Sequence, residues 1–269
     1  MLRSLNSGVS AMQQFQGKMD VIANNIANVN TIGYKSARVD FADSFSQLVQ
    51  GSSTIGPSQI GTGVITSGIT SQFNQGAITN TANANDLAIN GDGFFVVRDP
   101  ATNMQYATRA GDFKVGNDGY LVTSLGLRVQ GYSDSALTTL GDIKIDNDGS
   151  AESMSGYSFE ADGKISVQLS TNKITRGQVL LQKFANPQAL RKEGNNLYSG
   201  ITDAGPLAAL AAPKSSGLGE LKAQYLEMSN VDLAGQFSDL ITTQRAFQAS
   251  ARIITTSDEV LQELVNLKR

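Results

Sequence analysis

The chain of 269 residues contains no cysteine, no histidine and no tryptophan. Without cysteine and histidine there can be no disulfide, no thiolate zinc site and no Ser-His-Asp or Cys-His nucleophile. Proline is scarce as well, because there are 5 and all of them lie between two long helical patterns at the chain ends. Most familiar catalytic constellations are therefore excluded, and a building block is favoured over an enzyme.

The sequence also lacks an excess of one charge sign and a long apolar run. The net charge is -3, from 21 basic and 24 acidic residues that are interspersed. This balance favours neither nucleic acid nor an anionic membrane surface as a partner. No apolar run approaches the roughly 18 residues of a membrane span, and the start is too polar for a signal-peptide core. If the protein leaves the cytoplasm, we expect another export route.

Both ends of the chain carry apolar residues at a seven-residue spacing, which is typical of helices that pack along a common seam. In the C-terminal segment this row is Leu233, Leu240, Phe247, Ile254 and Leu261, and its flanking row is Phe237, Ala251 and Val265. In the N-terminal segment the row is Leu5, Met12, Met19 and Ile26, and its flanking row is Leu2, Val9 and Ala23, interrupted by Gln16. We call the two main rows the predicted seam. The spacing predicts a terminal helical domain, residues 1–33 and 220–269, whose helices pair as a coiled coil; an ordinary helical hairpin is the alternative.

Asparagines crowd the last turns of the first helix, which the pattern places from about residue 3 to about residue 30, ending near Gly33. An asparagine is a poor interior helix former, but its amide can bond to the backbone or to a packed neighbour. The residues concerned are Asn24, Asn25, Asn28 and Asn30. They form either a frayed helix end or a polar ladder that fixes the register of packed helices.

The middle of the chain predicts an antiparallel β domain over residues 72–198, barrel-like or sandwich-like, so the fold class is α+β. The predicted strands are Phe94–Val97, Phe113–Val115, Tyr120–Val122, Leu127–Val129, Ile143–Ile145, Ile165–Leu169 and Val179–Phe184. The predicted turns are Asn90–Gly93, Asn117–Gly119, Asp146–Gly149 and Asp162–Gly163. Two extended connectors, residues 34–71 and 199–219, join this domain to the helices, and the first of them begins with an amphipathic segment, Ala37–Val49.

Acidic residues in the β region leave an enzymatic alternative open. Asp146–Gly149 looks like part of an EF-hand loop, but its register puts Lys144 and Ser155 where calcium needs carboxylates. A carboxylate pair could hydrolyse glycosides without histidine. The candidates are Asp112, Asp118, Asp142 and Glu160. All lie at or near predicted turns and tryptophan is absent for sugar stacking, so we predict no catalytic residue, no metal and no cofactor. A ligand-binding module with helical oligomerisation ends is a third possibility.

Five segments resemble the signature sequences of bacterial flagellar axial proteins, the rod and hook family. Near the N-terminus this segment is MDVIANNIANVNTIGYK, residues 19–35. The β region contains DLAINGDGFFVV at 86–97, TRAGDFKVGNDGYLVTSLGLRVQGY at 108–132 and FANPQALRKEGNNLY at 184–198. The last segment is LEMSNVDLAGQFSDLITTQRAFQASARIITTSDEVLQELVNL, which starts at Leu226. On this resemblance the polar signature residues are Asn24, Asn25, Asn28, Asn30 and Asn230.

The resemblance implies a structural subunit that polymerises with its own copies into a hollow helical tube, with the helices inside and the β domains outside. It also implies a place in the hook or basal body, and export without a cleaved signal peptide. The implied partners are neighbouring rod and hook-filament junction proteins, the hook cap and the flagellar type III export apparatus, with no nucleic acid and no small-molecule substrate. The opening LRSLNSGVSAM, the DLAINGDGFF segment and the LRVQGY ending resemble hook sequences and favour the hook, a bendable joint that transmits torque. QIGTGV at 59–64 and the short length suit the alternative, the stiff distal rod.

Overall fold

The chain folds into two compact units, which the computed structural model describes over residues 2–50, 58–145, 154–169, 173–207 and 209–267. The helical unit consists of Met1–Val29, Ser36–Gln72 and Val231–Arg269, and the β body consists of Asn30–Lys35 and Phe73–Asn230. The polypeptide therefore crosses from one unit to the other after residues 29, 35, 72 and 230. These boundaries differ from the predicted ones, because both predicted connectors have packed structure of their own.

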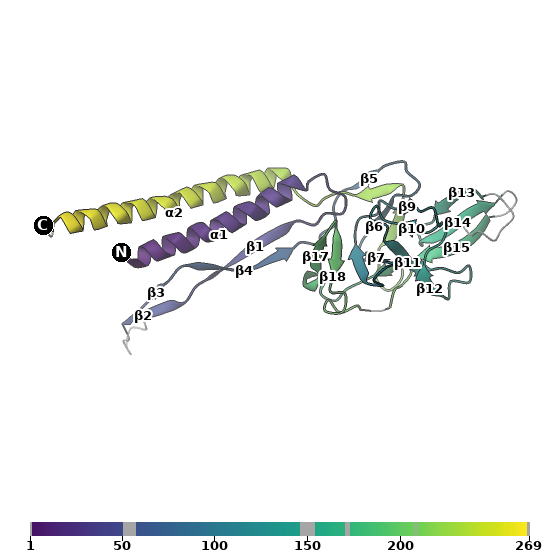
Figure 1. Cartoon of the computed structure of the whole chain (residues 1–269), viewed down its shortest axis with the longest axis horizontal. Helices are drawn as coiled ribbons and strands as arrows, with labels where there is room; N and C mark the ends of the chain where they lie inside the picture. The colour runs from purple at the N-terminus through teal and green to yellow at the C-terminus, as the bar shows by residue number, and fades with distance from the viewer. Residues whose placement is uncertain (1, 51–57, 146–153, 170–172, 208, 268–269) are drawn as a thin grey trace. The chain divides into compact units, whose positions relative to one another are not determined.

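Two long helices, α1 (Leu2–Ala27) and α2 (Leu233–Leu267), lie side by side in the helical unit (Figure 1). They run antiparallel, since Gly8 lies against Ile254 while Asn25 bonds to Gln236. The first helix ends three residues earlier than predicted, where Asn28 folds back on Asn24 through backbone and side-chain hydrogen bonds. None of the described helices is long and apolar enough to cross a membrane.

A two-stranded antiparallel ribbon completes the helical unit. Strand β1 (Ala37–Asp43) pairs with β4 (Val64–Ser71), and β2 (Ser46–Gln50) pairs with β3 (Ser58–Gly61). Alternation turns Val39 inward, and the Phe41 ring meets the Phe15 ring of α1 edge-on, with centroids 6.1 Å apart. The prediction of a connector over residues 34–71 was wrong where β1 and β4 form. Apolar residues at every second position of β1 let this strand pack on α1.

The β body is built around one large antiparallel sheet. Among the described residues its strand order is β13-β14-β15-β11-β7-β8-β18-β17, with β9, β10, β12 and β16 attached at its sides. The strands of the main path are β7 (Phe94–Arg98), β8 (Gln105–Thr108), β11 (Arg128–Tyr132), β13 (Met154–Phe159), β14 (Lys164–Leu169), β15 (Lys173–Val179), β17 (Arg191–Gly194) and β18 (Leu197–Ser199). The attached strands are β9 (Lys114–Val115), β10 (Leu121–Val122), β12 (Leu140–Asp142) and β16 (Leu181–Gln182), and a 3-10 turn spans Pro187–Ala189. The α+β prediction is confirmed.

Two small strand pairs join the beginning and the end of the long segment Phe73–Asn230 of the β body. Strand β5 (Ile78–Asn80) pairs with β20 (Tyr225–Glu227), and β6 (Leu87–Asn90) pairs with β19 (Glu220–Ala223). The helical prediction for residues 220–232 was therefore wrong. Helix α2 begins after these strands because Asp232 caps it, accepting the Ala234 N–H at 3.1 Å.

Two further predictions on the β region need correction. Ile143 and Ile145 are buried core residues, but β12 ends just before them and their amides bond to Val129 and Gly119 outside a regular strand. The predicted connector 199–219 packs as irregular chain, with Leu181 paired to Ala211 and Leu218 buried in the main core. The turns around Gly91, Gly119 and Gly163 are present with positive φ, as turn glycines require. The Asp146–Gly149 turn lies outside the described residues.

Candidate assembly surface

The contact between α1 and α2 is made by small and polar residues as well as by apolar ones. Ile22 is buried on α1, and Thr243 and Ser250 are buried on α2. A Cβ on Gly8 would lie 3.2 Å from Ile254 Cγ1, so the absence of a side chain at Gly8 allows the helices to approach closely. The two buried hydroxyls are satisfied within α2, because Thr243 donates to the Asp239 carbonyl and Ser250 to the Ala246 carbonyl.

The predicted seam contributes to this contact, since its member Ile254 lies against Gly8. Its members are half-buried in the single chain except for Leu233, which is 39% exposed. The half-buried members are Leu5, Met12, Met19, Ile26, Leu240, Phe247, Ile254 and Leu261. The helices also use residues that sequence reasoning passed over, since Thr243 and Ser250 are polar and interrupt the apolar pattern. Their position three residues after Leu240 and Phe247 was the available signal.

The flanking rows of both helices face outward. Val9 is 39% exposed, Phe237 is 49% exposed and Val265 is 65% exposed, whereas Ala251 is half-buried. Ala23 and the interrupting Gln16 are exposed too, and the side chain of Leu2 lies outside the described residues. These positions leave apolar surface on the outside of the helix pair.

Exposed apolar residues are concentrated on α2. We call the following set the outer apolar residues: Val9, Leu233, Phe237, Ile241, Ile253, Val260, Leu264, Val265 and Leu267. Each is between 39% and 83% exposed. Scattered apolar side chains are ordinary on a monomer, but on α2 they are more numerous than a solvated helix face needs.

Asn25 joins three elements of the helical unit. Its side-chain amide donates to the Ala37 carbonyl at 2.8 Å and to Gln236 Oε1 at 3.0 Å, and its Oδ1 accepts the Ala37 N–H at 3.0 Å. The side chain is buried, so α1, α2 and the start of β1 share one polar joint.

The other signature asparagines make more local contacts. Asn28 donates to Asn24 within the end of α1, and Asn30 is exposed. Asn230 belongs to the β body, where its side chain donates to the Asn74 carbonyl at 3.1 Å. A role of these residues in register between copies stays a prediction.

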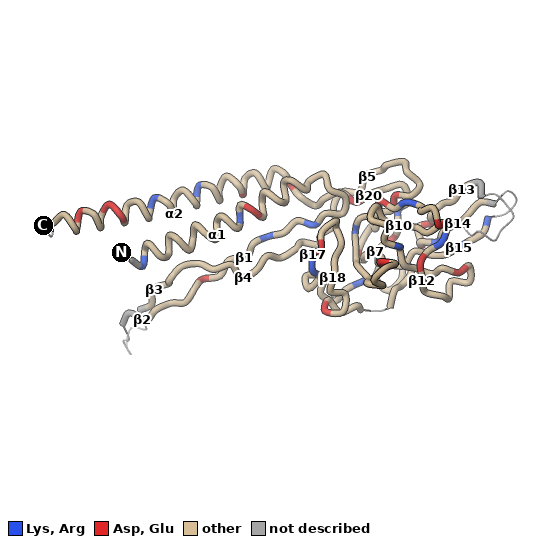
Figure 2. Tube along the Cα trace, viewed as in Figure 1, with Lys and Arg blue, Asp and Glu red and all other residues tan. Residues whose placement is uncertain are grey.

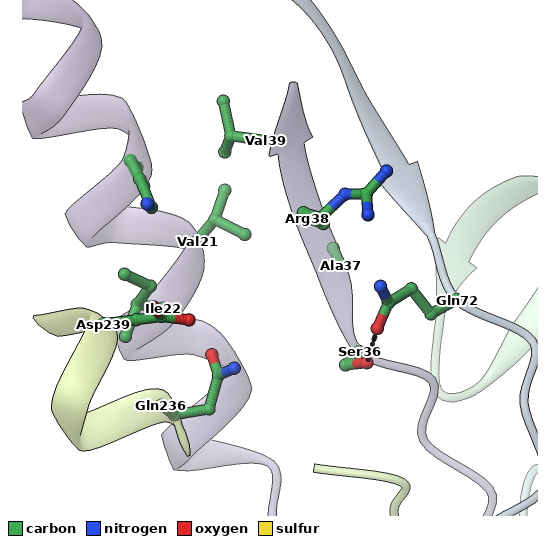
Figure 3. A pocket seen from close by; sticks show the side chains of 10 residues that line it. Val21, Ile22, Ser36, Ala37, Arg38, Val39, Gln72, Gln236 and Asp239 are labelled. Carbon is green, nitrogen blue, oxygen red and sulfur yellow. Dashed lines mark hydrogen bonds between the residues drawn. The ribbon is translucent and has the colours of Figure 1, made fainter. Parts of the chain in front are cut away.

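A shallow hollow of about 200 Å³ opens where α1, α2 and β1 meet (Figure 3). Figure 3 shows Val21 and Ile22 on one side, Gln236 and Asp239 beside them, and Arg38 across the gap. Arg38 forms an exposed ion pair with Asp40 at 2.9 Å. Apolar, amide and charged groups are mixed here, which suits a protein contact better than a reacting substrate.

The four carboxylates considered for hydrolysis have separate structural surroundings. Asp142 lies between Arg98 and Arg128 at 2.6 and 3.1 Å, and Glu160 pairs with Lys173 at 2.9 Å. Asp118 is exposed in its turn. Burial, assisted by the Asp86 charge, raises the pKa of Asp112.

Two further observations bear on metals and on charged partners. Within the described ranges no three acidic, histidine or cysteine side chains gather into a metal-binding group. Figure 2 shows basic and acidic residues interspersed along both units.

Three family models match separate parts of the chain. Residues 5–35 match the model described as flagella basal body rod protein, and residues 88–167 match the flagellar hook protein FlgE/F/G D1 domain. Residues 222–267 match the flagellar basal body rod FlgEFG protein C-terminal model. The matched ranges include α1, much of the large sheet and α2.

Relatives extend the similarity over the whole chain. The flagellar basal-body rod protein FlgG of Bacillus subtilis (strain 168) is 44% identical over an alignment of 277 positions, which covers 100% of both chains. The protein of the same name from Buchnera aphidicola subsp. Baizongia pistaciae is 37% identical and 93% of each chain is covered. The flagellar hook protein FlgE of Borreliella burgdorferi is 27% identical over an alignment of 445 positions, with 100% of both chains covered.

Proposed function

Because this chain belongs to the flagellar basal-body rod and hook protein family, we propose that it is a subunit of the distal rod, the stiff shaft of the flagellar motor. Its place is the bacterial flagellum, and its role is structural rather than enzymatic. One observation carries the choice of the rod. The Bacillus subtilis rod protein aligns with this chain at 44% identity over 277 positions, close to the chain's own length of 269 residues. The alignment with the hook protein of Borreliella burgdorferi is 445 positions long and has 27% identity.

This proposal reverses the preference drawn from the sequence. The opening segment and the DLAINGDGFF motif favoured the hook, but such segments are shared within the family and discriminate poorly between members. Overall length and sequence identity along the whole chain distinguish rod from hook proteins better than these short segments do. The hook stays the second candidate, because residues 88–167 match a model that is described by the hook protein name.

We further propose that copies of the chain polymerise through the helical unit. The outer apolar residues on α1 and α2 remain exposed in the single chain, and a neighbouring copy would bury them. The predicted seam lies beside them, so an assembled helix layer can extend the in-chain pair into continuous coiled-coil packing. Each helix alone buries little surface, and assembly would therefore add much of its stability.

Electron microscopy of basal bodies from a strain lacking this protein tests the assignment. We expect a truncated rod, because subunits distal to the gap have nothing to assemble on. A complete rod that lacks only its hook would identify the hook protein instead. Intact hooks on complete basal bodies would contradict both assignments, and restoring the wild-type chain should restore the normal structure as the control.

A further inference from the structure

A cluster of three charged side chains is buried in the β body. Glu227, at the end of β20, is 0% exposed, and its Oε1 accepts from Lys35 Nζ at 2.6 Å. Its Oε2 accepts from Arg109 Nη1 at 3.2 Å. Lys35 is also 0% exposed and Arg109 is 4% exposed, so water does not share these contacts.

The cluster joins the segments through which the chain enters and leaves the β body. Lys35 ends the short segment Asn30–Lys35, and Glu227 lies just before the exit after residue 230. The third segment begins at Phe73: the Gly76 N–H donates to Glu227 Oε1 at 2.9 Å, and Lys35 Nζ donates to the Asn74 carbonyl at 2.7 Å. The Glu227 carboxylate belongs to the last segment, and it is bonded to the first segment through Lys35 and to the segment that begins at Phe73 through Gly76.

Backbone contacts continue the same arrangement. The Gly33 N–H donates to the Glu227 carbonyl at 2.7 Å, and the Met228 N–H donates to the Ala77 carbonyl at 2.8 Å. Gly33 has a φ of +67°, and a Cβ there would lie 2.7 Å from the Ala110 nitrogen, so glycine is required for the close approach. The segments are therefore packed against one another as well as bonded to the charges.

Neighbouring side chains hold the first segment from its other side. Lys192 Nζ donates to the Lys35 carbonyl at 2.8 Å, and the Asn196 side chain donates to the Ile32 carbonyl at 2.6 Å. Arg109 is fixed by the Gly91 carbonyl at 3.0 Å and by the Phe94 ring, 5.1 Å from its guanidinium carbon. The charged groups are thus preorganised by contacts that lie outside the cluster.

The energetics of buried charge make such a cluster cooperative. A charged group can be buried only while its partners remain in place. Losing one partner leaves the other charged groups buried with fewer compensating contacts, which costs free energy. Burial lowers the pKa of Lys35, and the Glu227 carboxylate opposes that shift. Detaching the segment of Lys35 or of Glu227 would separate buried opposite charges. Detaching the segment that begins at Phe73 would remove the hydrogen bonds of Gly76 to Glu227 and of Lys35 to Asn74. Partial opening is therefore disfavoured relative to opening of all three segments.

We propose that Lys35, Glu227 and Arg109 form a clamp that holds the three crossing segments together, so that they detach from the β body jointly and not one at a time. The clamp itself does not depend on the rod assignment. Its use does rest on the proposed function: in a shaft under torque, these segments would carry force along the backbone between the helices and the β body, and joint attachment would spread that force over all three.

Hydrogen exchange on the purified full-length chain tests the clamp. The variant Lys35→Met removes the charge of the first segment, and the Gly33 and Met228 amides report on the first and last segments. Neither amide bonds to the substituted side chain. We expect both to exchange roughly 10- to 100-fold faster, the factor for losing hydrogen bonds to a charged group, while amides of β7 and β11 stay protected.

Three outcomes would overturn the proposal. Faster exchange at Gly33 alone would mean that the segments are held independently. Equal acceleration in β7 and β11 would make the cluster an ordinary part of core stability, and unchanged exchange would remove any role. Asp142→Asn is the control, because it removes one charge from a different ion cluster of the β body, the one that Asp142 forms with Arg98 and Arg128, and it should leave Gly33 and Met228 unaffected.

A second measurement covers the case in which Lys35→Met does not fold. In the wild-type chain, the Gly33 and Met228 amides should share one opening free energy and one denaturant slope, since a joint opening exposes the same surface for both. Different slopes for the two amides would overturn the clamp without any variant.

Discussion

Gly8 and Gly17 lie on the same helix but have different surroundings. Nothing lies within 4 Å of a Cβ built on Gly17, whereas one on Gly8 would meet Ile254. Because alanine is the better helix former, Gly17→Ala should stabilise the chain by about 0.5–1 kcal/mol. Gly8→Ala should gain less or lose stability, since Ile254 must shift. Urea unfolding followed by helix circular dichroism measures both, and an equal gain in both variants would contradict the close helix contact.

Asp142 should make the β body sensitive to acid. Partial burial alone would raise the pKa of Asp142, but hydrogen bonds from Arg98, Gln130 and Arg128 outweigh it and hold the pKa below its usual value. A lowered folded pKa contributes stability above the unfolded pKa of about 4, and this stability is lost as pH falls through the folded pKa. Asp142→Asn should therefore cost about 2 kcal/mol at pH 7 and flatten the loss of stability below about pH 4, measured by urea unfolding across pH.

Asp112 supplies the control of opposite sign. Its pKa is raised by burial and by the Asp86 charge, so protonation of Asp112 favours the folded state as the pH falls. Asp112→Asn should remove that gain and steepen the loss of stability in acid. The same direction of change in both variants would contradict the electrostatic account.

At the scale of elements, the two faces of α2 should respond differently to charge. Leu240 is half-buried beside α1, whereas Phe237 is 49% exposed. Leu240→Asp should destabilise the helical unit by about 2–4 kcal/mol as well as block polymerisation. Phe237→Asp should leave the folded chain intact and still block polymerisation, measured by thermal unfolding and by electron microscopy of assembled tubes.

An exposed polar position on the same helix provides the control for these variants. Thr242→Asp introduces the same charge where no apolar surface is lost, and it should assemble normally. Normal tubes from Phe237→Asp would show that the outer apolar residues face solvent in the polymer.

The elements that sequence patterns identified are those whose signal is local. The two helices carry a sustained heptad spacing, and strands such as Phe94–Val97 and Ile165–Leu169 follow glycine turns, so their positions agree closely with β7 and β14. The ribbon and the 220–227 strands were missed for a physical reason. Their partners are distant in the chain, as in the pairing of Leu221 with Ile89. In the ribbon, the glycine and serine content of β3 and β4 also imitates a linker.

The same limit applies to the candidate site. Spacing could place Leu240 and Phe247 on one helix face, but it could not show that buried Thr243 and Ser250 lie between the helices. The buried charges gave no signal, because Lys35 and Glu227 are 192 positions apart and each resembles an ordinary surface residue in sequence. Asn25 was identified because four asparagines at the end of one helix are unusual.

At the scale of the whole molecule, the β body should fold without the helices if it keeps Asn30–Lys35. The Gln72 N–H donates to the Ser36 carbonyl at 2.8 Å and Ala37 pairs with Ser71, so a short Asn-Gly turn can replace residues 38–70. A fragment of residues 30–230 with this replacement should melt cooperatively. A fragment of residues 73–230 lacks Lys35 and should melt roughly 10 °C lower, from a loss of about 3–5 kcal/mol.

Calorimetry on the two fragments decides this prediction. Equal melting temperatures would mean that Asn30–Lys35 adds nothing to the β body. Failure of the longer fragment to fold at all would mean that the helical unit is needed for it.

The paired ribbon limits how this protein can change in evolution. Strands β1 and β4 pair residue by residue from Ala37 and Ser71 to Asp43 and Val64, with one irregularity between Asp40 and Phe41. Because side chains alternate between faces, an odd insertion would turn the Val39 side of the ribbon away from α1 unless a second bulge absorbed it. Lineages that lengthen or shorten the ribbon should therefore do so by matched, even-numbered steps on both strands. Such paired insertions in β1 and β4 would be visible when sequences of this protein from different genomes are compared.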